Sequence, residues 1–410
     1  MIKTILTNSA WFFGAQVIIK LISFCYTIFL ARNLGVSDFG LYSVALAYFS
    51  LFSSISDFGF NRYLITELAI NSSKIPQLLF GIGIFRVTVT SILFAVFAIV
   101  LYLFDPEKIR VSLILLATLS TIPQAAAFTF DSVFVALEKL QYSALGLIAL
   151  SISTIILGVY FILSGYGVMG AIGVLIVGQI VYLTILAISF MRQKFVLHIN
   201  INWLIIKNII LGSFPYGFVG VLGLLYFKVD TLILSYLKGS FDVGIYSAGY
   251  KFLEALIFIP SSLSLALFPN IVKWIETNPS RVYNLYVKST ILLFFISLGV
   301  VAAYLLLLPQ VITFFLPQYL SSIAVIKILS LTIPFMFMIS IQGITLFSDK
   351  KFLKALVVVS IFNLVLNIVM NFYLIPRYSY FGSAWATLIS DVIGFTIFFF
   401  YIKGKLQRLK

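Results

Sequence analysis

Residues 77–104 read QLLFGIGIFRVTVTSILFAVFAIVLYLF and contain one charged side chain, Arg86. A helix needs about twenty predominantly apolar residues to cross a bilayer, so this stretch is long enough to do so. Further apolar runs follow the same pattern near residues 9–31, 40–60, 111–136, 141–164, 168–191, 208–236, 243–272, 284–308, 321–347, 352–375 and 382–402. The sequence therefore predicts an all-α integral membrane protein with about twelve transmembrane helices.

The composition supports this class. The chain of 410 residues is 62% hydrophobic and 10% charged, whereas a soluble domain is about 45–50% apolar and about a quarter charged. The single cysteine, Cys25, excludes an intramolecular disulfide, and the single histidine, His198, has no second histidine with which to share a metal ion. No cofactor or metal site is predicted. Prolines inside the runs predict local helix breaks at Pro123, Pro215, Pro260 and Pro334.

The net charge of +14 does not indicate nucleic-acid binding, because the basic residues lie at the ends of the apolar runs. With the N-terminus taken as cytoplasmic, the inner connectors carry 17 Lys and Arg residues and the outer connectors carry 5. The positive-inside rule then places both termini in the cytoplasm of a multi-pass protein of the cytoplasmic (inner) membrane. The first apolar run is full length and carries Lys20 at its centre, so no cleavable signal peptide is expected.

Two short sequences recur at almost half the chain length. Gly40-Leu-Tyr-Ser-Val-Ala returns 204 residues later as Gly244-Ile-Tyr-Ser-Ala-Gly, and Gly170-Ala171 after Tyr166 returns as Gly382-Ser383-Ala384 after Tyr378. An even number of spans per half makes the halves parallel repeats, an arrangement typical of transporters whose substrate site lies between the halves. We expect six-helix bundles at 1–200 and 201–410 around a central cavity.

Ten charged residues lie within the predicted spans. They are Lys20, Arg86, Lys228, Lys251, Lys327, Asp57, Asp131, Asp230, Glu254 and Asp391. A charge in the bilayer centre is costly and usually faces the interior of the bundle or a wet cavity, so a polar interior is expected. Lys20 is the strongest cavity candidate, because from mid-span it cannot easily reach either interface.

Structural roles are the alternatives for several of these groups. Lys327 would extend to the outer interface, and Asp57 and Asp131 would be helix-end residues that pair with Arg62 or Lys139. Lys251 and Glu254 are three residues apart on one helix face, so a simple bridge between them is possible. Lys228 and Asp230 point in different directions and should have different neighbours. Asn363, Asn367 and Asn371 share a face, where polar contact between helices is the preferred interpretation over substrate contact.

Three stretches resemble a known family. LARNLGVSDFGLYSVALAYFSLFSSISDFG (Leu30–Gly59) is similar to the signature of Wzx-type polysaccharide and O-antigen repeat-unit flippases, of the multidrug/oligosaccharidyl-lipid/polysaccharide exporter superfamily. FKVDTLILSYLKGSFDVGIY (Phe227–Tyr246) resembles the family's span 7–8 junction, and NLVLNIVMNFYLIPRYSYFGSAWATL (Asn363–Leu388) its span 11–12 junction. With the span count, the resemblance covers nearly the whole chain.

The resemblance implies two six-helix halves around a cavity that opens to one side at a time. It also implies polyprenyl-diphosphate-linked oligosaccharides as substrates, with H⁺ or Na⁺ as a coupling ion and other polysaccharide-assembly proteins as a further class of partner. The family positions carried over are Arg32, Gly35, Gly40, Gly59, Asp230, Gly244 and Tyr246. From depth in the membrane we predict a diphosphate- and sugar-binding lining of Lys20, Arg86, Lys228 and Lys251, and coupling carboxylates at Asp230 and Glu254.

Two other functions are alternatives to a flippase. A cation or drug antiporter of the same superfamily would be expected to have an acidic cavity, whereas the spans here hold five bases and five acids. A membrane polysaccharide polymerase or ligase would need a sizeable outer loop for its catalytic groups, and the predicted connectors are short. The sequence has no GxxxxGK[ST] loop for ATP. The flippase is the preferred prediction.

Overall fold

The computed structural model describes residues 2–71, 75–193, 203–275, 277–348 and 350–408. Within that part every regular element is a helix. The first half contains α1 (Ile2–Leu34), α2 (Val36–Asp57), α3 (Phe60–Ile70), α4 (Ile75–Phe104), α5 (Lys108–Leu119), α6 (Thr121–Ala136), α7 (Leu140–Leu163) and α8 (Gly167–Met191). The second contains α9 (Trp203–Lys238), α10 (Ser240–Leu256), α11 (Phe258–Trp274), α12 (Pro279–Phe315), the 3₁₀ turn η2 (Pro317–Tyr319), α13 (Ser322–Ser330), α14 (Ile333–Phe347), α15 (Lys350–Tyr378) and α16 (Tyr380–Arg408).

The number of membrane spans agrees with the prediction. Among the described residues, ten helical segments are long and apolar enough to cross a membrane, and twelve do so if the bent pairs α10–α11 and α13–α14 each form one span. The all-α membrane fold is therefore confirmed. The predictions did not include α3, which occupies a connector expected to lie on the inner side.

The order of the helices repeats along the chain. In each half a long helix is followed by a broken pair, a second long helix, a second broken pair and two more long helices. The breaks before α6, α11 and α14 come just ahead of Pro123, Pro260 and Pro334. A proline fits the first turn of a helix because the donor that it lacks would have no partner there. The break predicted at Pro215 is wrong, since α9 continues through this residue.

The chain forms two compact units by proximity of its backbone. Unit 1 contains Met1–Leu34 and Leu41–Leu224, and unit 2 contains Gly35–Gly40 and Leu225–Lys410. The start of α2 thus belongs to unit 2, and most of α9 to unit 1. The division at 200/201 into two six-helix bundles remains a prediction.

Unit 1 is organised around α8, which packs against α5, α6 and α7, while α4 and α3 cover α6. Its buried apolar core includes Phe60, Leu64, Phe134, Tyr182 and Leu186. The outer face of α4 exposes Ile92, Val96, Ile99 and Leu103, spaced three or four residues apart. Such an exposed apolar stripe is suited to lipid rather than water.

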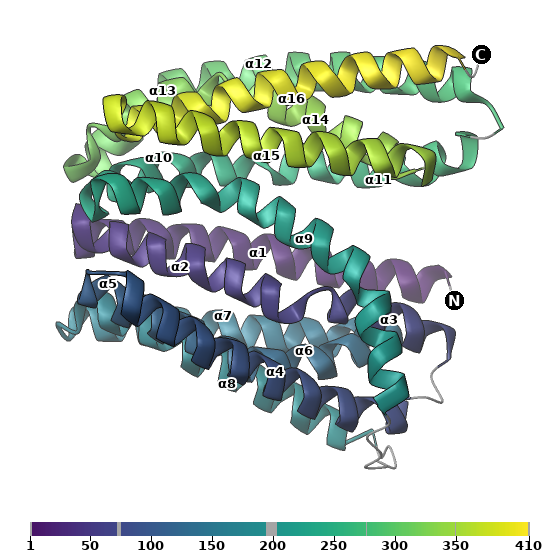
Figure 1. Ribbon diagram of the computed structural model, residues 1–410, viewed down its shortest axis with the longest axis horizontal. Helices are drawn as coiled ribbons and strands as arrows, with labels where there is room; N and C mark the ends of the chain where they lie inside the picture. The colour runs from purple at the N-terminus through teal and green to yellow at the C-terminus, as the bar shows by residue number, and fades with distance from the viewer. Residues whose placement is uncertain (1, 72–74, 194–202, 276, 349, 409–410) are drawn as a thin grey trace. The chain divides into compact units, whose positions relative to one another are not determined.

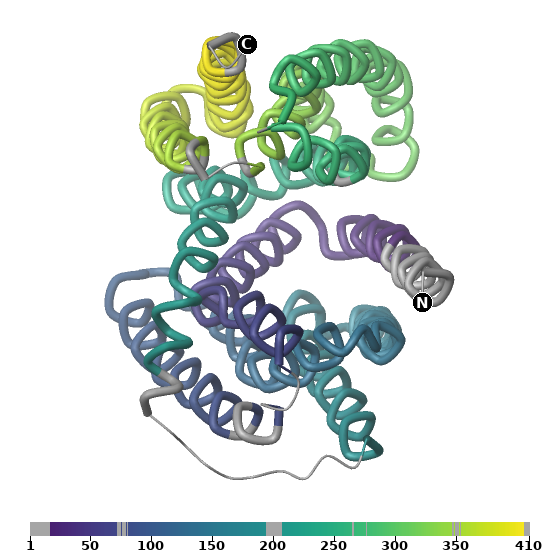
Figure 2. Tube along the Cα trace, turned by 90° about the vertical axis from the view of Figure 1, so that its right-hand side faces the viewer, coloured from purple at the N-terminus to yellow at the C-terminus, as the bar shows by residue number. Residues whose placement is uncertain are grey.

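Unit 2 uses the same pairs of neighbours. Here α16 packs against α13, α14 and α15, while α12 and α11 cover α14. The pair α15–α16 lies side by side in Figure 1 and again in the turned view of Figure 2, where it is coloured yellow-green and yellow. The repeat seen in the order of the helices therefore extends to the way each unit packs.

Candidate functional site

A triad of charges joins α9 to α10 in unit 2. Lys228 Nζ lies 2.6 Å from Glu254 Oε1, and Lys251 Nζ lies 2.7 Å from Glu254 Oε2. All three side chains are partly buried. The predicted Lys251–Glu254 pair is present, and the geometry adds Lys228 from the neighbouring helix. The structure thus brings two of the four predicted lining bases together on one carboxylate.

Asp230 lies two residues from Lys228 but has entirely different neighbours, as its direction on the helix predicted. Its Oδ1 accepts a hydrogen bond from Asn371 Nδ2 (2.7 Å). Its Oδ2 accepts hydrogen bonds from Tyr246 Oη (2.9 Å) and Thr387 Oγ1 (2.6 Å). Asn371 also donates to Asn367 Oδ1 (3.0 Å), one turn away on α15. The Asp230 cluster therefore joins α9, α10, α15 and α16 with neutral donors.

The second buried acid of unit 2 is Asp391 on α16, which has no role among the predictions. Its Oδ1 accepts a hydrogen bond from Tyr226 Oη at 2.6 Å. No ion pair to Asp230 or Asp391 is found among the residues that the structure describes. The sequence predictions did not include Thr387 or Tyr226. Each of them donates a hydrogen bond to an intramembrane carboxylate that is distant in the sequence, so no local pattern marks it.

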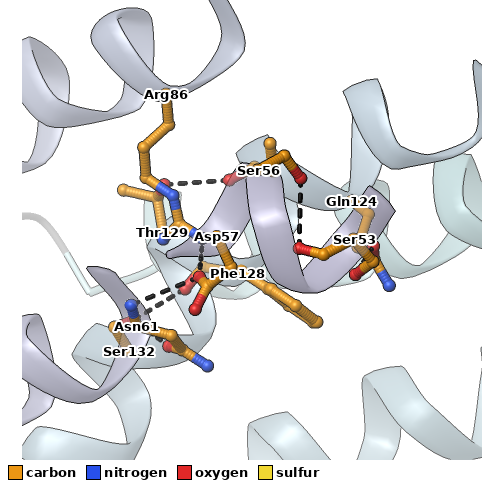
Figure 3. A network of polar contacts seen from close by, with 10 residues as sticks. Ser53, Ser56, Asp57, Asn61, Arg86, Gln124, Phe128, Thr129 and Ser132 are labelled. Carbon is orange, nitrogen blue, oxygen red and sulfur yellow. Dashed lines mark hydrogen bonds and ion pairs between the residues drawn. The ribbon is translucent and has the colours of Figure 1, made fainter. Parts of the chain in front are cut away.

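Unit 1 holds a separate polar network around Asp57 (Figure 3). Arg86 Nη2 on α4 lies 2.5 Å from Asp57 Oδ1 at the end of α2, and the Arg86 side chain is 1% exposed. Asp57 Oδ1 also accepts a hydrogen bond from the Asn61 backbone N–H (3.3 Å), and Ser132 of α6 donates to Asn61 Oδ1. Asp57 lies at a helix end, as one alternative stated, but its ion-pair partner is Arg86 on another helix rather than Arg62. As the helices stand, Arg86 offers no surface to a ligand.

The remaining predicted bases lie apart from these pairs. Lys20 on α1 is exposed and belongs to unit 1, as does Arg32 at the end of α1. Lys139 donates to Gln193 Oε1 (2.5 Å), and no ion pair between Lys139 and Asp131 is found among the described residues. Lys327 on α13 is exposed, which fits its expected reach to an interface. No group of three His, Cys, Asp or Glu side chains that could hold a metal ion occurs in the described ranges.

The predicted family glycines lie where a side chain is disfavoured, either by a left-handed φ angle or by close backbone contact. Gly35 directly follows α1 and has a φ angle of +77°. Gly239, its counterpart 204 residues later, directly follows α9 and has a φ angle of +88°. A left-handed φ is unfavourable for residues with a Cβ. Gly40 and Gly244 lie close together at the starts of α2 and α10, and Gly59 (φ +80°) lies against the backbone of Ser213 and Gly217. Tyr246 is buried as a donor to Asp230, so it is part of the polar cluster.

Comparison with known proteins places the chain in a family. The sequence model of the family described as "Polysaccharide biosynthesis protein" matches residues 5–275. The chain belongs to this family. The model described as "MatE" matches residues 215–373, a shorter stretch that lies within the second half. No curated protein sequence matches the chain.

Solved structures with the same fold extend the comparison beyond the matched residues of the polysaccharide biosynthesis family. An inward-facing multidrug resistance MATE family transporter of the MOP superfamily is 15% identical, with 95% of each chain covered and a TM-score of 0.74. The lipid II flippase MurJ in an inward closed conformation is also 15% identical, with 97% of this chain and 89% of MurJ covered and a TM-score of 0.74. A MOP superfamily transporter from Pyrococcus furiosus is 15% identical, with 99% and 96% covered and a TM-score of 0.59. At this identity the likeness shows the fold alone.

Proposed function

We propose that this protein is a flippase that moves polyprenyl-diphosphate-linked oligosaccharides from the inner to the outer leaflet of the cytoplasmic membrane by alternating access. The family match supports a place in polysaccharide biosynthesis, and the lipid II flippase MurJ has the same fold. The observation that carries the proposal is the convergence of Lys228 and Lys251 on Glu254 at membrane depth. Two cations and one carboxylate leave the triad with one net positive charge.

A positive, partly exposed triad suits a diphosphate for a simple physical reason. A sugar diphosphate cannot enter hydrocarbon unaided, because its charges and hydroxyls would lose water without replacement. Charge-assisted hydrogen bonds from ammonium groups to phosphate oxygens replace part of that hydration. In this proposal Lys20, Lys228 and Lys251 bind the diphosphate and sugar, and Arg86 joins them when the helices of unit 1 move.

Asp230 is the proposed coupling carboxylate. It is 3% exposed, it receives neutral hydrogen bonds from three other helices, and no cation pairs with it in the described part of the chain. A buried acid surrounded by oxygen and amide groups can exchange a proton or bind Na⁺ without first breaking an ion pair. Glu254 was the other predicted candidate, but its two lysine partners favour a role as their counter-ion.

A cation or drug antiporter is the second candidate, favoured by one observation. Asp230 and Asp391 are buried acids of unit 2 that the structure pairs with hydroxyl and amide donors alone. A cationic substrate could bind there. The lysine pair argues against this candidate, since it would repel such a substrate from the same unit.

Complementation in cells and transport assays with purified protein separate the two candidates. The wild-type protein should restore glycan export in a strain that lacks its polysaccharide flippase, and in proteoliposomes it should move a fluorescent polyprenyl-diphosphate oligosaccharide between leaflets. Lys251→Ala and Lys228→Ala should each reduce both activities at matched expression. A wild-type protein that exports organic cations and leaves the lipid-linked sugar in place would support the antiporter and reject the flippase.

A further inference from the structure

In the Lys228–Glu254–Lys251 triad, two ammonium groups share a single carboxylate. One carboxylate serves two ammonium groups from different helices, one through each oxygen, at 2.6 and 2.7 Å. An ammonium group has three donors, so each lysine still has donors left after binding Glu254. The described residues provide no second carboxylate for either lysine. Glu254 therefore holds both cations while compensating only one of them.

The partial exposure of the triad makes this arrangement reversible. The side chains of Lys228, Lys251 and Glu254 are 19%, 28% and 25% exposed, in contrast to 1% for Arg86 in the other ion pair at membrane depth. The Arg86–Asp57 pair has a carboxylate that is 21% exposed, but its guanidinium is buried, so opening this pair leaves a buried cation without a partner. Glu254 can turn away toward solvent, and both lysines would then be open to a different anion.

From this geometry we infer that Glu254 is an internal competitor of the substrate diphosphate. This inference rests on the proposed function. The bound carboxylate occupies the two ammonium groups when no substrate is present, and the diphosphate displaces it because two phosphates offer more oxygen atoms and more charge than one carboxylate. Glu254 is thus a positioning residue that acts through the lysines.

Competition by Glu254 would help the transporter to release its substrate. A transporter must release its cargo, and a site that binds an anion too tightly would trap it. When Glu254 returns to the lysines it replaces the contacts that the diphosphate gives up, so release leaves no bare pair of cations in the membrane. Removal of the Glu254 charge should therefore strengthen binding and slow turnover.

Binding of farnesyl diphosphate to the full-length protein in detergent tests the inference. Glu254→Gln should bind this probe about tenfold more tightly than wild type, a factor that corresponds to about 1.4 kcal/mol. The uncharged alcohol farnesol should bind wild type and variant equally. In proteoliposomes Glu254→Gln should lower both KM and kcat for the lipid-linked sugar. Equal or weaker binding of farnesyl diphosphate by a folded Glu254→Gln protein would overturn the inference.

Two further variants make the result specific. Adding Lys251→Gln or Lys228→Gln to Glu254→Gln should cancel the gain in affinity, because the freed cation would be gone. Asp242→Asn removes an acid from the first turn of the same helix, about 18 Å away at 1.5 Å per residue, and should bind like wild type. A gain as large in Asp242→Asn would overturn the inference in favour of general electrostatics.

Failure of the inference can be told from failure of the proposed function. If wild type complements a flippase-null strain and binds farnesyl diphosphate, but Glu254→Gln binds no more tightly, the inference alone is rejected. If wild type neither complements nor moves the lipid-linked sugar, the proposed function is rejected. Thermal unfolding of each variant confirms that the compared proteins are folded.

Discussion

Gly40 lies against the backbone carbonyl of Ser240, and Gly244 lies against the backbone carbonyl of Val36, so the two glycines make reciprocal contacts. The spacing is 204 residues from Gly40 to Gly244 and from Val36 to Ser240. Equivalent residues of the repeat thus meet at the starts of α2 and α10, and a Cβ on either glycine would overlap a carbonyl group. All four residues belong to unit 2.

Gly40→Ala should therefore destabilise the protein by about 1–3 kcal/mol, the range for an overpacked site. Gly244→Ala should do the same. The measurement is thermal unfolding in detergent, followed by tryptophan fluorescence. Gly299→Ala is the matched control, because a Cβ there meets nothing within 4 Å and alanine favours the helix. An equal loss of stability in the control would contradict these close backbone contacts as the cause.

The Arg86–Asp57 pair predicts a strong effect in unit 1. Asp57→Asn leaves a guanidinium that is 1% exposed without its carboxylate, which should cost about 3–5 kcal/mol. Replacing both partners, as in Arg86→Met with Asp57→Asn, should recover most of the loss because no buried charge remains. Denaturation of the two single variants and the double variant gives the coupling directly. Additive losses would show that the pair does not act as a unit.

Asp230→Asn should abolish transport driven by a proton or sodium gradient in proteoliposomes. The amide matches the carboxylate in size but neither takes up a proton nor carries the charge that binds Na⁺. Substrate binding should persist, since Lys228 and Lys251 pair elsewhere. Gradient-driven transport that continues at the wild-type rate would reject Asp230 as the coupling group. Residual coupling in Asp230→Asn that disappears in the double variant Asp230→Asn with Glu254→Gln would be assigned to Glu254.

The topology prediction can be tested at exposed positions. It puts residues 105 and 239 on the outer side, but Asp105 is bound to Arg110, and Gly239 has a left-handed φ. Ser164, after α7, is exposed and predicted to be on the same side, while Thr277, before α12, is exposed and predicted to be inside. In a Cys25→Ala background, a membrane-impermeant thiol reagent should label Ser164→Cys in intact cells. Thr277→Cys should react only after permeabilisation, and the reverse result would reject the orientation.

A pH dependence follows from Asp105, which lies between α4 and α5. Burial alone would raise the pKa of Asp105. Hydrogen bonds from Arg110 (Nε, 2.8 Å; Nη2, 2.6 Å) and from the Glu107 backbone N–H outweigh the effect of burial, so the pKa of Asp105 lies below its ordinary value. A lowered pKa in the folded state contributes stability above the unfolded value of about 3.9, which is lost as pH falls through the folded value. Asp105→Asn should be less stable than wild type at pH 7, and the difference in melting temperature should shrink below about pH 4. A difference that is constant with pH would contradict this linkage.

The sequence predicted the elements whose cause is local. Each predicted span corresponds to a helix or a broken pair, and Lys251 and Glu254 pair because three residues on a helix set their spacing. The sequence did not predict the contacts between residues on different helices. Arg86 meets Asp57 from another helix, and Thr387 reaches Asp230 across 157 residues, so neither contact leaves a periodic signal. Pro215 did not end α9, because a proline within a long helix can bend the helix without ending it.

The division of α9 between the units limits how this protein can be cut or recombined. Phe214 packs edge-on against Phe58 (ring centroids 5.5 Å apart), and Gly217 lies against the Phe58 carbonyl, so this part of α9 completes unit 1. A polypeptide that ends after α8 would lack that segment, and the complementary one would lack residues 35–40 of unit 2. A chimera that joins the first half of this chain to the second half of a relative would therefore mix two parents inside both units. Functional exchange between relatives requires that the matching residues of α2 and α9 be carried over with the half that they complete.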